Sequence, residues 1–179
     1  MIIGLCGYAR TGKDTVANIL VENHGFQRVA FADPIKRLLF EINPLVNGVR
    51  LQDMVKDYGW EITKSQMEVR RLLQDLGVGA RKVFGEIFWI EQALKKVNLS
   101  KDYVITDVRF RNEVNAIKQF NSQIWRIKRT GIEAINGHVS EHDLDGYEAD
   151  VTLLNEGPVE YLPLLVAEQI DALRGKKKS

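Results

Sequence analysis

Three residues near the start of the chain have the types and the spacing that phosphate chemistry needs. Gly7, Gly12 and Lys13 stand in the pattern G-x-x-x-x-G-K, after an apolar run at residues 2–6 and before an amphipathic run that begins at Lys13. Glycines let the backbone curl so that several amides point at one anion, and a helix N-terminus adds free amides and a positive dipole end. This order of strand, loop and helix predicts a loop that binds a triphosphate, with Lys13 as the mobile cation for the β- and γ-phosphates. A chance glycine-rich turn, the alternative, does not explain the order.

The residue after Lys13 departs from the usual pattern. Ser or Thr normally follows the lysine and binds Mg²⁺, whereas this chain has Asp14 there and Thr15 next. Because a carboxylate suits a hard cation, Asp14 is a candidate metal ligand, directly or through water. The alternative is an acidic residue that the dipole of a helix N-terminus stabilises, and both interpretations can hold together.

A second group of candidates follows the apolar run Val104–Thr106. Asp107 stands where an aspartate orients Mg²⁺ or its waters in nucleotide sites, although many strands end in Asp for turn reasons. Arg109 lies close beside it and suits bidentate binding of a phosphate. A structural ion pair of Arg109 with Asp107 or Glu113 is the alternative.

A third group lies in the middle of the chain. Arg70 and Gln74 are one helical turn apart, which suits a second phosphate and a base or sugar, or else an ordinary solvated helix face. Trp89 is placed to stack on a base, although a tryptophan in an apolar helix is more often a core residue.

The pattern of elements predicts an α/β fold with a parallel sheet covered on both faces. Strands are expected at residues 2–6, 26–32, 103–106, 124–128 and 151–154. Helices are expected at residues 13–23, from Asp33 as N-cap to residue 42, at 51–58, at 68–76 with a break at Gly77 and Gly79, at 84–97, at 113–120, and from the turn at 155–158 to about 173. Ligands collect at the carboxyl ends of parallel strands. The positions just past the expected strand ends are the phosphate loop, Asp33, Asp107, Arg129 and Asn155.

Composition narrows the function further. The 179 residues fit a single domain, and a net charge of +1 gives no electrostatic case for binding nucleic acid or an anionic membrane. Cys6 is the single cysteine of the chain, so it has no disulfide partner. We interpret it as a core residue of a protein in a reducing cytoplasm. We expect no export signal and no membrane span. His24, His138 and His142 lack the spacing of zinc ligands, and the terminal lysines 176–178 read as a solvated tail.

A polar segment at about residues 130–150 is predicted to act as a lid. It lies next to Arg126, Lys128 and Arg129 in the sequence, and a closing lid would exclude water that otherwise hydrolyses ATP. A triphosphate site together with a second cationic site fits phosphoryl transfer, which depends on positioning and charge stabilisation.

Several segments together resemble the phage deoxynucleoside monophosphate kinases. The segments, in chain order, are residues 7–15, Phe31–Lys36, Val69–Gly77, Phe88-Trp89, Asp107–Glu113, His138–Glu141 and Asn155–Gly157. The resemblance implies the adenylate-kinase-like P-loop fold, with five parallel strands, helices on both faces, a helical acceptor-binding region at about 34–100 and a lid-like segment. It also implies transfer of the γ-phosphate of ATP to a deoxynucleoside monophosphate, with Mg²⁺, giving ADP and the diphosphate. The Asp14 departure is shared by that family.

The resemblance implies roles for individual residues. The catalytic residues would be Lys13, Arg109 and Arg129. ATP would be bound by Gly7, Arg10, Thr11, Gly12, Lys13, Asp14, Thr15, Asn155 and Gly157, with the last two beside adenine. The acceptor would be bound by Asp33, Lys36, Arg70, Arg71, Gln74, Gly77, Trp89, Asp107, Arg109 and Glu113. The metal would be held by Asp14 and Asp107.

Two other function classes stay open at this point. Another small-molecule kinase, of the dephospho-coenzyme A or phosphomevalonate type, has a similar loop and sheet. A non-catalytic nucleotide switch is less favoured, because a switch needs no second cationic site. The resemblance implies small-molecule substrates only, a location in the cytoplasm of an infected host cell, and leaves a homodimer open.

Overall fold

The computed structural model describes residues 1–132 and 142–175. The chain divides into two compact units, one made of residues 1–30 and 97–179 and the other of residues 31–96. Residues 31–96 include most of the helical acceptor-binding region that the resemblance implies at about residues 34–100. We call them the sheet unit and the helical unit.

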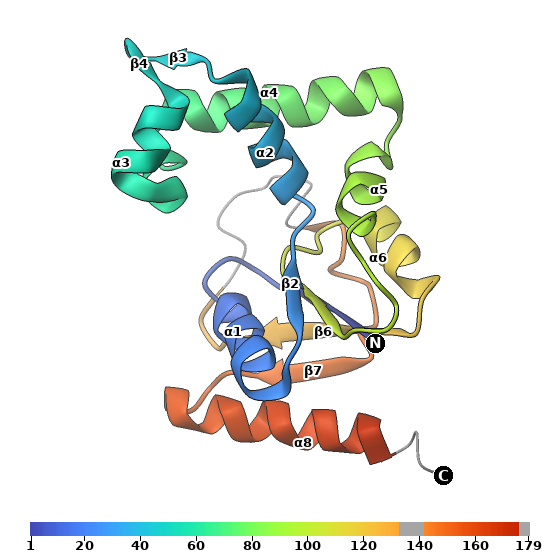
Figure 1. Ribbon diagram of the computed structural model, residues 1–179. Coiled ribbons are helices and arrows are strands. Elements are labelled where there is room, and N and C mark those ends of the chain that lie inside the picture. The colour runs from blue at the N-terminus through green and yellow to red at the C-terminus, as the bar shows by residue number, and fades with distance from the viewer. Residues whose placement is uncertain (133–141, 176–179) are drawn as a thin grey trace. The chain divides into compact units, whose positions relative to one another are not determined.

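The sheet unit contains five parallel strands. They are β1 (Ile2–Cys6), β2 (Gln27–Val29), β5 (Tyr103–Ile105), β6 (Ser122–Lys128) and β7 (Val151–Leu154), in the order β2-β5-β1-β6-β7 (Figure 1). β1 is central, pairing Ile2 with Tyr103 on one side and with Ser122 on the other. All five residues of β1 are buried, as expected for a strand covered on both faces. The predicted fold class is therefore confirmed.

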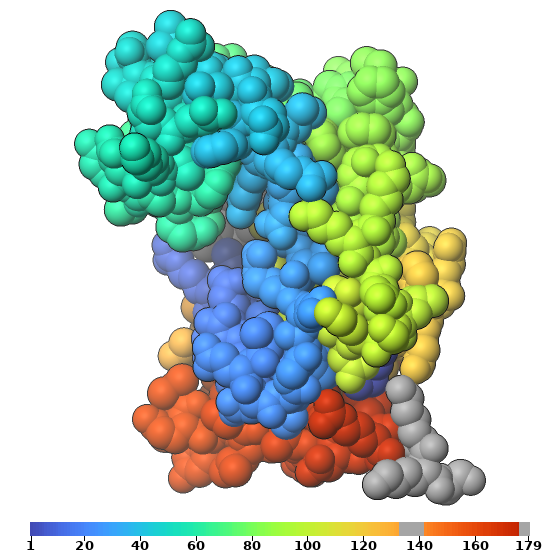
Figure 2. All heavy atoms as spheres, viewed as in Figure 1, coloured from blue at the N-terminus to red at the C-terminus, as the bar shows by residue number. Residues whose placement is uncertain are grey.

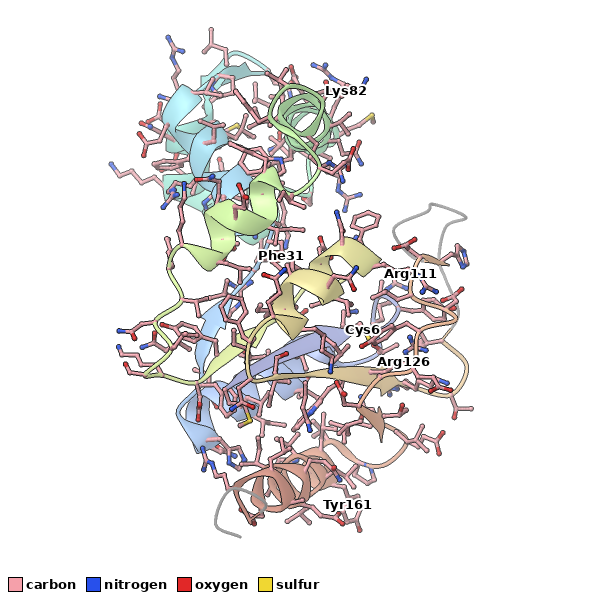
Figure 3. All side chains as sticks on the ribbon, turned by 90° about the vertical axis from the view of Figure 1, so that its right-hand side faces the viewer. Cys6, Phe31, Lys82, Arg111, Arg126 and Tyr161 are labelled. Carbon is pink, nitrogen blue, oxygen red and sulfur yellow. The ribbon has the colours of Figure 1, made fainter. Side chains whose placement is uncertain are left out.

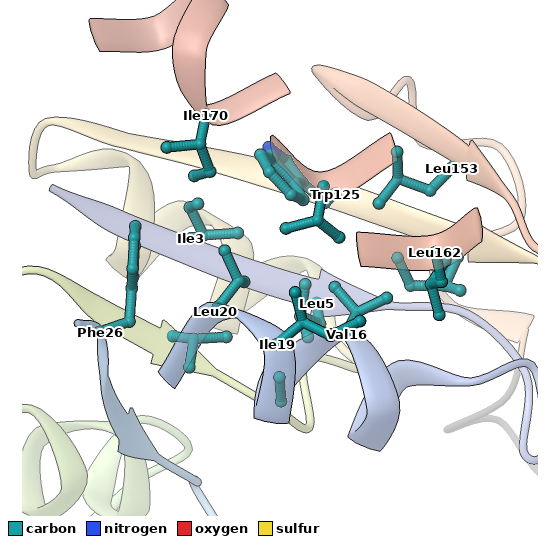
Figure 4. Packing of buried hydrophobic residues seen from close by; sticks show 14 residues of the cluster. Ile3, Leu5, Val16, Ile19, Leu20, Phe26, Trp125, Leu153, Leu162 and Ile170 are labelled. Atoms are coloured by element: carbon teal, nitrogen blue, oxygen red, sulfur yellow. The ribbon is translucent and has the colours of Figure 1, made fainter. Parts of the chain in front are cut away.

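Two helices, α1 (Lys13–His24) and α8 (Leu162–Gly175), cover one face of this sheet. They also pack against each other, as the blue and red atoms in Figure 2 show. The side chains beneath them form one cluster (Figure 4), in which Trp125 of β6 is fully buried. Full burial of one large apolar side chain contributes about 2 kcal/mol to stability. This cluster holds β1 and α1 in place, and the loop between them with it.

The opposite face carries α6 (Arg111–Lys118). Gly4 of β1 faces this side, where a Cβ atom would come within 3.0 Å of Ile117 of α6. The missing side chain lets α6 lie close to the central strand. A short 3-10 helix, η1 (Val159–Tyr161), precedes α8.

The helical unit begins with α2 (Asp33–Ile42) and a two-stranded hairpin, β3 (Leu45–Val46) and β4 (Val49–Arg50). It continues with α3 (Leu51–Thr63), α4 (Met67–Phe84) and α5 (Phe88–Leu94). A separate cluster of buried residues lies among these elements: Leu39, Val46, Leu51, Met54 and Val69.

Several sequence predictions for the helical unit are wrong in extent. The helix predicted to break at Gly77 runs through Gly77 and Gly79 to Phe84. Each of the two glycines costs the helix about 1 kcal/mol, and burial of Val69 and Ala80 along α4 offsets that cost. The break falls instead at Gly85, whose φ of 103° ends α4. The helix predicted at residues 84–97 is therefore shorter, from Phe88 to Leu94.

Smaller differences lie at other boundaries. The strand predicted at residues 26–32 is only Gln27–Val29. Ala32, not Asp33, is the N-cap of α2, so Asp33 is the first acidic residue within the helix. The hairpin β3–β4 was not predicted, and α3 extends past the expected residue 58 with a kink at Gly59, where φ is 75°. Within the described residues, no helix is long and apolar enough to cross a membrane.

Candidate nucleotide site

The loop between β1 and α1 has the geometry that its glycines predict. Gly7 has a φ of 132°, and a Cβ atom there would collide with the backbone carbonyl of Ile127 on β6. The buried Thr11 donates its hydroxyl to the carbonyl of Tyr8 at 2.9 Å. The ammonium of Lys13 donates to the carbonyls of Gly7 and Tyr8 at 2.8 and 2.6 Å, which holds the cation over the loop.

Asn155 supports the loop from the end of β7. Its backbone amide donates to the carbonyl of Lys128 at 2.8 Å, and its side-chain Nδ2 donates to the carbonyl of Thr11 at 2.9 Å. The same Nδ2 occupies the space that a Cβ on Gly12 would fill. Asn155 therefore contacts the phosphate loop itself, in addition to lining a cavity beside it.

One cavity, of about 340 Å³, lies beside the N-terminus of α1; we call it the helix-side cavity. It is lined by Arg10, Gly12, Lys13, Asp14, Thr15, Arg129, Asn155, Gly157, Val159 and Leu162. These residues include all of the ATP-binding residues predicted from the sequence except Gly7 and Thr11. The structure thus brings together residues from both ends of the chain.

A second cavity, of about 370 Å³, lies beside the ends of β1, β5 and β6; we call it the strand-side cavity. It is lined by Gly7, Tyr8, Ala9, Thr11, Lys13, Val108, Arg109, Arg126, Ile127, Lys128, Arg129, Ile132, Leu144 and Asp145. Five of these are cationic and one is a carboxylate. Lys13 and Arg129 line both cavities, so the two adjoin at these two cations.

Arg126 is a lining residue that sequence reasoning did not place in the site. It lies on β6 opposite Cys6 of β1 in the sheet register (Figure 3). Its guanidinium donates to the carbonyls of Leu144 and Asp145 at 2.5 and 3.4 Å. Burial raises the pKa of the Cys6 thiol, and its hydrogen bond with Arg126 only partly offsets this. The signal in the sequence was an arginine between the apolar residues Trp125 and Ile127 of an expected strand.

A carboxylate network also borders the strand-side cavity and was not predicted. Asp145 accepts a hydrogen bond from the hydroxyl of Tyr8 at 2.8 Å, and His142 Nδ1 lies 2.8 Å from its other oxygen. The hydrogen bond with His142 is the main cause of the lowered pKa of Asp145. The network connects the phosphate loop to residues 142–145.

The turn after β5 is shaped by Glu113. Its Oε2 accepts the backbone amides of Arg109 and Phe110 at 2.6 and 3.0 Å, which caps α6. Burial raises the pKa of Glu113 to about 7, the two backbone hydrogen bonds oppose the rise, and the charge of Asp107 adds to it. Arg109 lines the strand-side cavity, whereas Asp107 is among the lining residues of neither cavity.

The acceptor residues predicted in the helical unit have varied surroundings. Arg70 and Gln74 are exposed on α4, and Arg70 Nε donates to the carbonyl of Lys64 at 3.3 Å. Arg71 forms an exposed ion pair with Asp75 at 3.1 Å. Lys36 lies 4.0 Å from Asp33 on α2.

Trp89 has a different environment from these charged residues. Its side chain is 6% exposed, and its indole N–H donates to the carbonyl of Gly77 at 3.0 Å. This burial favours the core interpretation of Trp89 over stacking on a base.

Part of the predicted lid and metal assignments can be located. Residues 133–141, with His138–Glu141, lie outside the described residues. Within the described part of the segment, Asp150 pairs with Lys118 at 2.6 Å and accepts the amide of Ile124. No group of three or more His, Cys, Asp or Glu suited to a metal occurs in the described residues. Asp14 and Thr15, which line the helix-side cavity, offer the oxygen atoms that Mg²⁺ prefers.

Comparison with known proteins identifies the family. The family model for deoxynucleotide monophosphate kinase matches residues 1–46 and 44–165. A protein of Acanthamoeba polyphaga mimivirus, provisionally named a deoxynucleotide monophosphate kinase, is 31% identical over 176 residues, 89% of this chain and 91% of its own length. The deoxynucleotide monophosphate kinase of Enterobacteria phage T4 is 28% identical over 105 residues, 55% of this chain and 44% of the phage protein.

A solved shikimate kinase from Aquifex aeolicus aligns over 99% of this chain and 98% of its own, with a TM-score of 0.48 and 14% identity. The family match covers most of the chain and agrees with the phosphate loop, the parallel sheet and the cationic strand ends. The chain belongs to the deoxynucleotide monophosphate kinase family, a family of ATP-dependent phosphotransferases acting on nucleoside monophosphates.

Proposed function

We propose that the helix-side cavity binds ATP and the strand-side cavity binds the phosphate of a deoxynucleoside monophosphate. The observation that carries this assignment is that the two cavities share Lys13 and Arg129. Transfer requires the γ-phosphate of the donor and the acceptor phosphate to meet with their reacting oxygens in line. Two adjoining cavities with cations at their junction meet that requirement.

The cations then divide by role. Lys13 and Arg129 stabilise the charge of the transferring phosphoryl group, because they stand where the two cavities adjoin. Arg109 binds the acceptor phosphate from the strand-side cavity, where a guanidinium makes bidentate charge-assisted hydrogen bonds. Arg126 adds positive charge there, although two backbone carbonyls already accept hydrogen bonds from its guanidinium.

Mg²⁺ would be held by Asp14, with Thr15 beside it, and when bound it neutralises phosphate charge. Both residues lie in the first turn of α1 and line the helix-side cavity, next to Lys13. Asp107 remains a second candidate, as the carboxylate that follows β5.

In the helical unit, we propose that Arg70 and Gln74 contact the acceptor nucleotide. Both are exposed and stand one turn apart on α4, so their polar ends are available on one face. Asp33, Lys36, Arg71 and Gly77 remain weaker candidates of the same unit. Trp89 is the least suited to contact a base, because it is buried.

Release of ADP, measured by a coupled assay, tests the proposal. The panel of acceptors contains the four deoxynucleoside monophosphates, their ribose counterparts, dephospho-coenzyme A and phosphomevalonate. We expect turnover on deoxynucleotides at least equal to that on ribonucleotides. Turnover of dephospho-coenzyme A or phosphomevalonate, with none on any nucleotide, would contradict the proposal.

Lys13→Ala tests the shared cation directly. Losing one charge-stabilising group should lower kcat about a hundredfold or more. Lys101→Ala is the matched control, since Lys101 is exposed in the loop before β5. Near-normal kcat in Lys13→Ala would show that the donor site lies elsewhere.

Arg109→Ala and Arg70→Ala test the acceptor side. Each should raise the KM for the acceptor or strongly lower kcat, and should leave ATP binding in the absence of acceptor nearly unchanged. Lysine at either position should rescue only in part, because it keeps the charge but loses the bidentate fork. A lower melting temperature with an unchanged acceptor KM would mean that the arginine has a structural role only.

A further inference from the structure

We propose that Asn155 is a positioning residue for phosphate binding, which aims the backbone amide of Gly12 at the triphosphate. This goes beyond the role beside adenine that the resemblance implies for Asn155, and it rests on the proposed donor site. The observation that carries it is the hydrogen bond of 2.9 Å from Asn155 Nδ2 to the carbonyl of Thr11.

The carbonyl of Thr11 and the amide of Gly12 belong to one peptide group. No cis peptide bond occurs in the described part of the chain, so this group is trans and its C=O and N–H point in opposite directions. A donor that fixes the carbonyl therefore also fixes the direction of the amide. The amide of Gly12 points away from Asn155.

The surroundings of Gly12 make this arrangement specific. Gly12 has a φ of 104°, and Asn155 Nδ2 occupies the place where a Cβ would stand. Gly12 also accepts the first bond of α1, from the amide of Val16 at 3.0 Å. The two peptide groups that flank the Cα atom of Gly12 are thus both held, the one before it by Asn155 and the one after it by the first bond of α1.

Asn155 is itself well anchored. Its backbone amide donates to Lys128 at 2.8 Å, so its position is set by the pairing of β6 and β7. Thr11 is 1% exposed, which keeps water from replacing the side-chain donor at its carbonyl. An anchored donor and a buried acceptor make the geometry of the loop depend on the sheet.

This role predicts a loss of affinity that does not depend on the base. Asn155→Asp keeps the shape but replaces the donor with a carboxylate facing the Thr11 carbonyl, and Asn155→Ala removes the donor without adding charge. Each should weaken binding of ATP, GTP and inorganic tripolyphosphate in parallel, by about tenfold or more, as expected for one lost hydrogen bond at a buried acceptor. The KM for the acceptor should stay nearly unchanged.

The matched control is Asn98→Asp. Asn98 lies before β5, at the opposite end of that strand from the site, and its Oδ1 accepts the amide of Ser100 at 3.0 Å. The substitution adds the same charge and keeps that acceptor, so tripolyphosphate binding should not change. The melting temperature of each variant shows whether it is folded. If Asn155→Asp does not fold, Asn155→Ala alone tests the loss of tripolyphosphate binding.

The outcomes separate the two proposals. If wild-type protein binds neither ATP nor tripolyphosphate, the donor site itself is wrong. If wild-type protein binds tripolyphosphate and the Asn155 variants bind it equally well, the positioning role is wrong while the donor site stands. If ATP affinity falls but GTP and tripolyphosphate affinities do not, Asn155 contacts the adenine instead.

Discussion

Glu113→Gln should make the protein more stable at pH 8 than the wild type, by up to about 3 kcal/mol. Burial raises the pKa of Glu113 from its ordinary 4.5 to about 7 in the folded chain. Each unit of difference in pKa between the folded and the unfolded chain corresponds to about 1.4 kcal/mol, which gives this upper value. The structural reason is that a carboxylate becomes largely desolvated when the turn after β5 forms.

The direction follows from proton binding. Between pH 4.5 and about 7 the unfolded chain has already lost the proton that the folded chain still holds at Glu113. The free energy of unfolding therefore falls as the pH rises through this range, and levels off above it. Below pH 4.5 this contribution to stability is fully present.

Glutamine at position 113 should prevent this fall in the free energy of unfolding at high pH and keep the turn after β5 intact. In the wild type a single oxygen, Oε2, accepts both backbone amides, from Arg109 and Phe110. The carbonyl oxygen of glutamine can accept the same two bonds, and it carries no charge at any pH. The two proteins should therefore differ little near pH 4 and increasingly up to pH 8.

Urea unfolding of both proteins at pH values from 4 to 8 measures this difference. Every other titrating group is common to both proteins. The pH dependence of the difference between their free energies of unfolding therefore belongs to Glu113. Glu113→Ala is the control: it also removes the charge but loses both hydrogen bonds, so it should be less stable than Glu113→Gln by about 1 kcal/mol at every pH through loss of the helix cap. A difference between the glutamine variant and the wild type that does not change with pH would refute the reasoning.

Three further substitutions give clear expectations. Gly79→Ala should raise the free energy of unfolding by about 0.5–1 kcal/mol in urea titrations, because Gly79 lies inside α4 and a Cβ there meets open space. Gly7→Ala should abolish ATP binding in calorimetry, because a Cβ would collide with the carbonyl of Ile127 at a φ of 132°. Trp89→Phe should lower stability by about 1–3 kcal/mol, because the carbonyl of Gly77 loses its buried donor, and it should leave the acceptor KM unchanged.

The sequence predicted those parts of the fold that depend on local pattern. β1 and β7 have the expected bounds, since each is a short apolar run between clear breaks. The phosphate loop, Asp107, Arg129 and Asn155 all follow strand ends of the sheet unit, because parallel strands end at one edge. The extent of α4 was not predictable in this way, because buried contacts of the helical unit outweigh the cost of two glycines.

The remainder of the site depends on contacts between residues far apart in the chain. Tyr8 and Asp145 are 137 positions apart, and Thr11 and Asn155 are 144 positions apart. No local spacing predicts such pairs. Sequence reasoning placed Asn155 near the nucleotide through its strand end, but only the folded chain gives it a partner in the phosphate loop.

The charge of the chain illustrates the same difference between composition and arrangement. With 25 Lys and Arg residues against 24 Asp and Glu residues, the net charge of +1 gives no electrostatic reason to expect binding of nucleic acid or of an anionic membrane. Nevertheless five cationic residues line the strand-side cavity, with Asp145 as the only carboxylate among the lining residues in the described part of the chain. Electrostatic interactions inside such a recess are stronger than on an open surface, because less water screens them. A nearly neutral protein can therefore concentrate positive charge at one place in its fold, which suits an enzyme that acts on nucleotides.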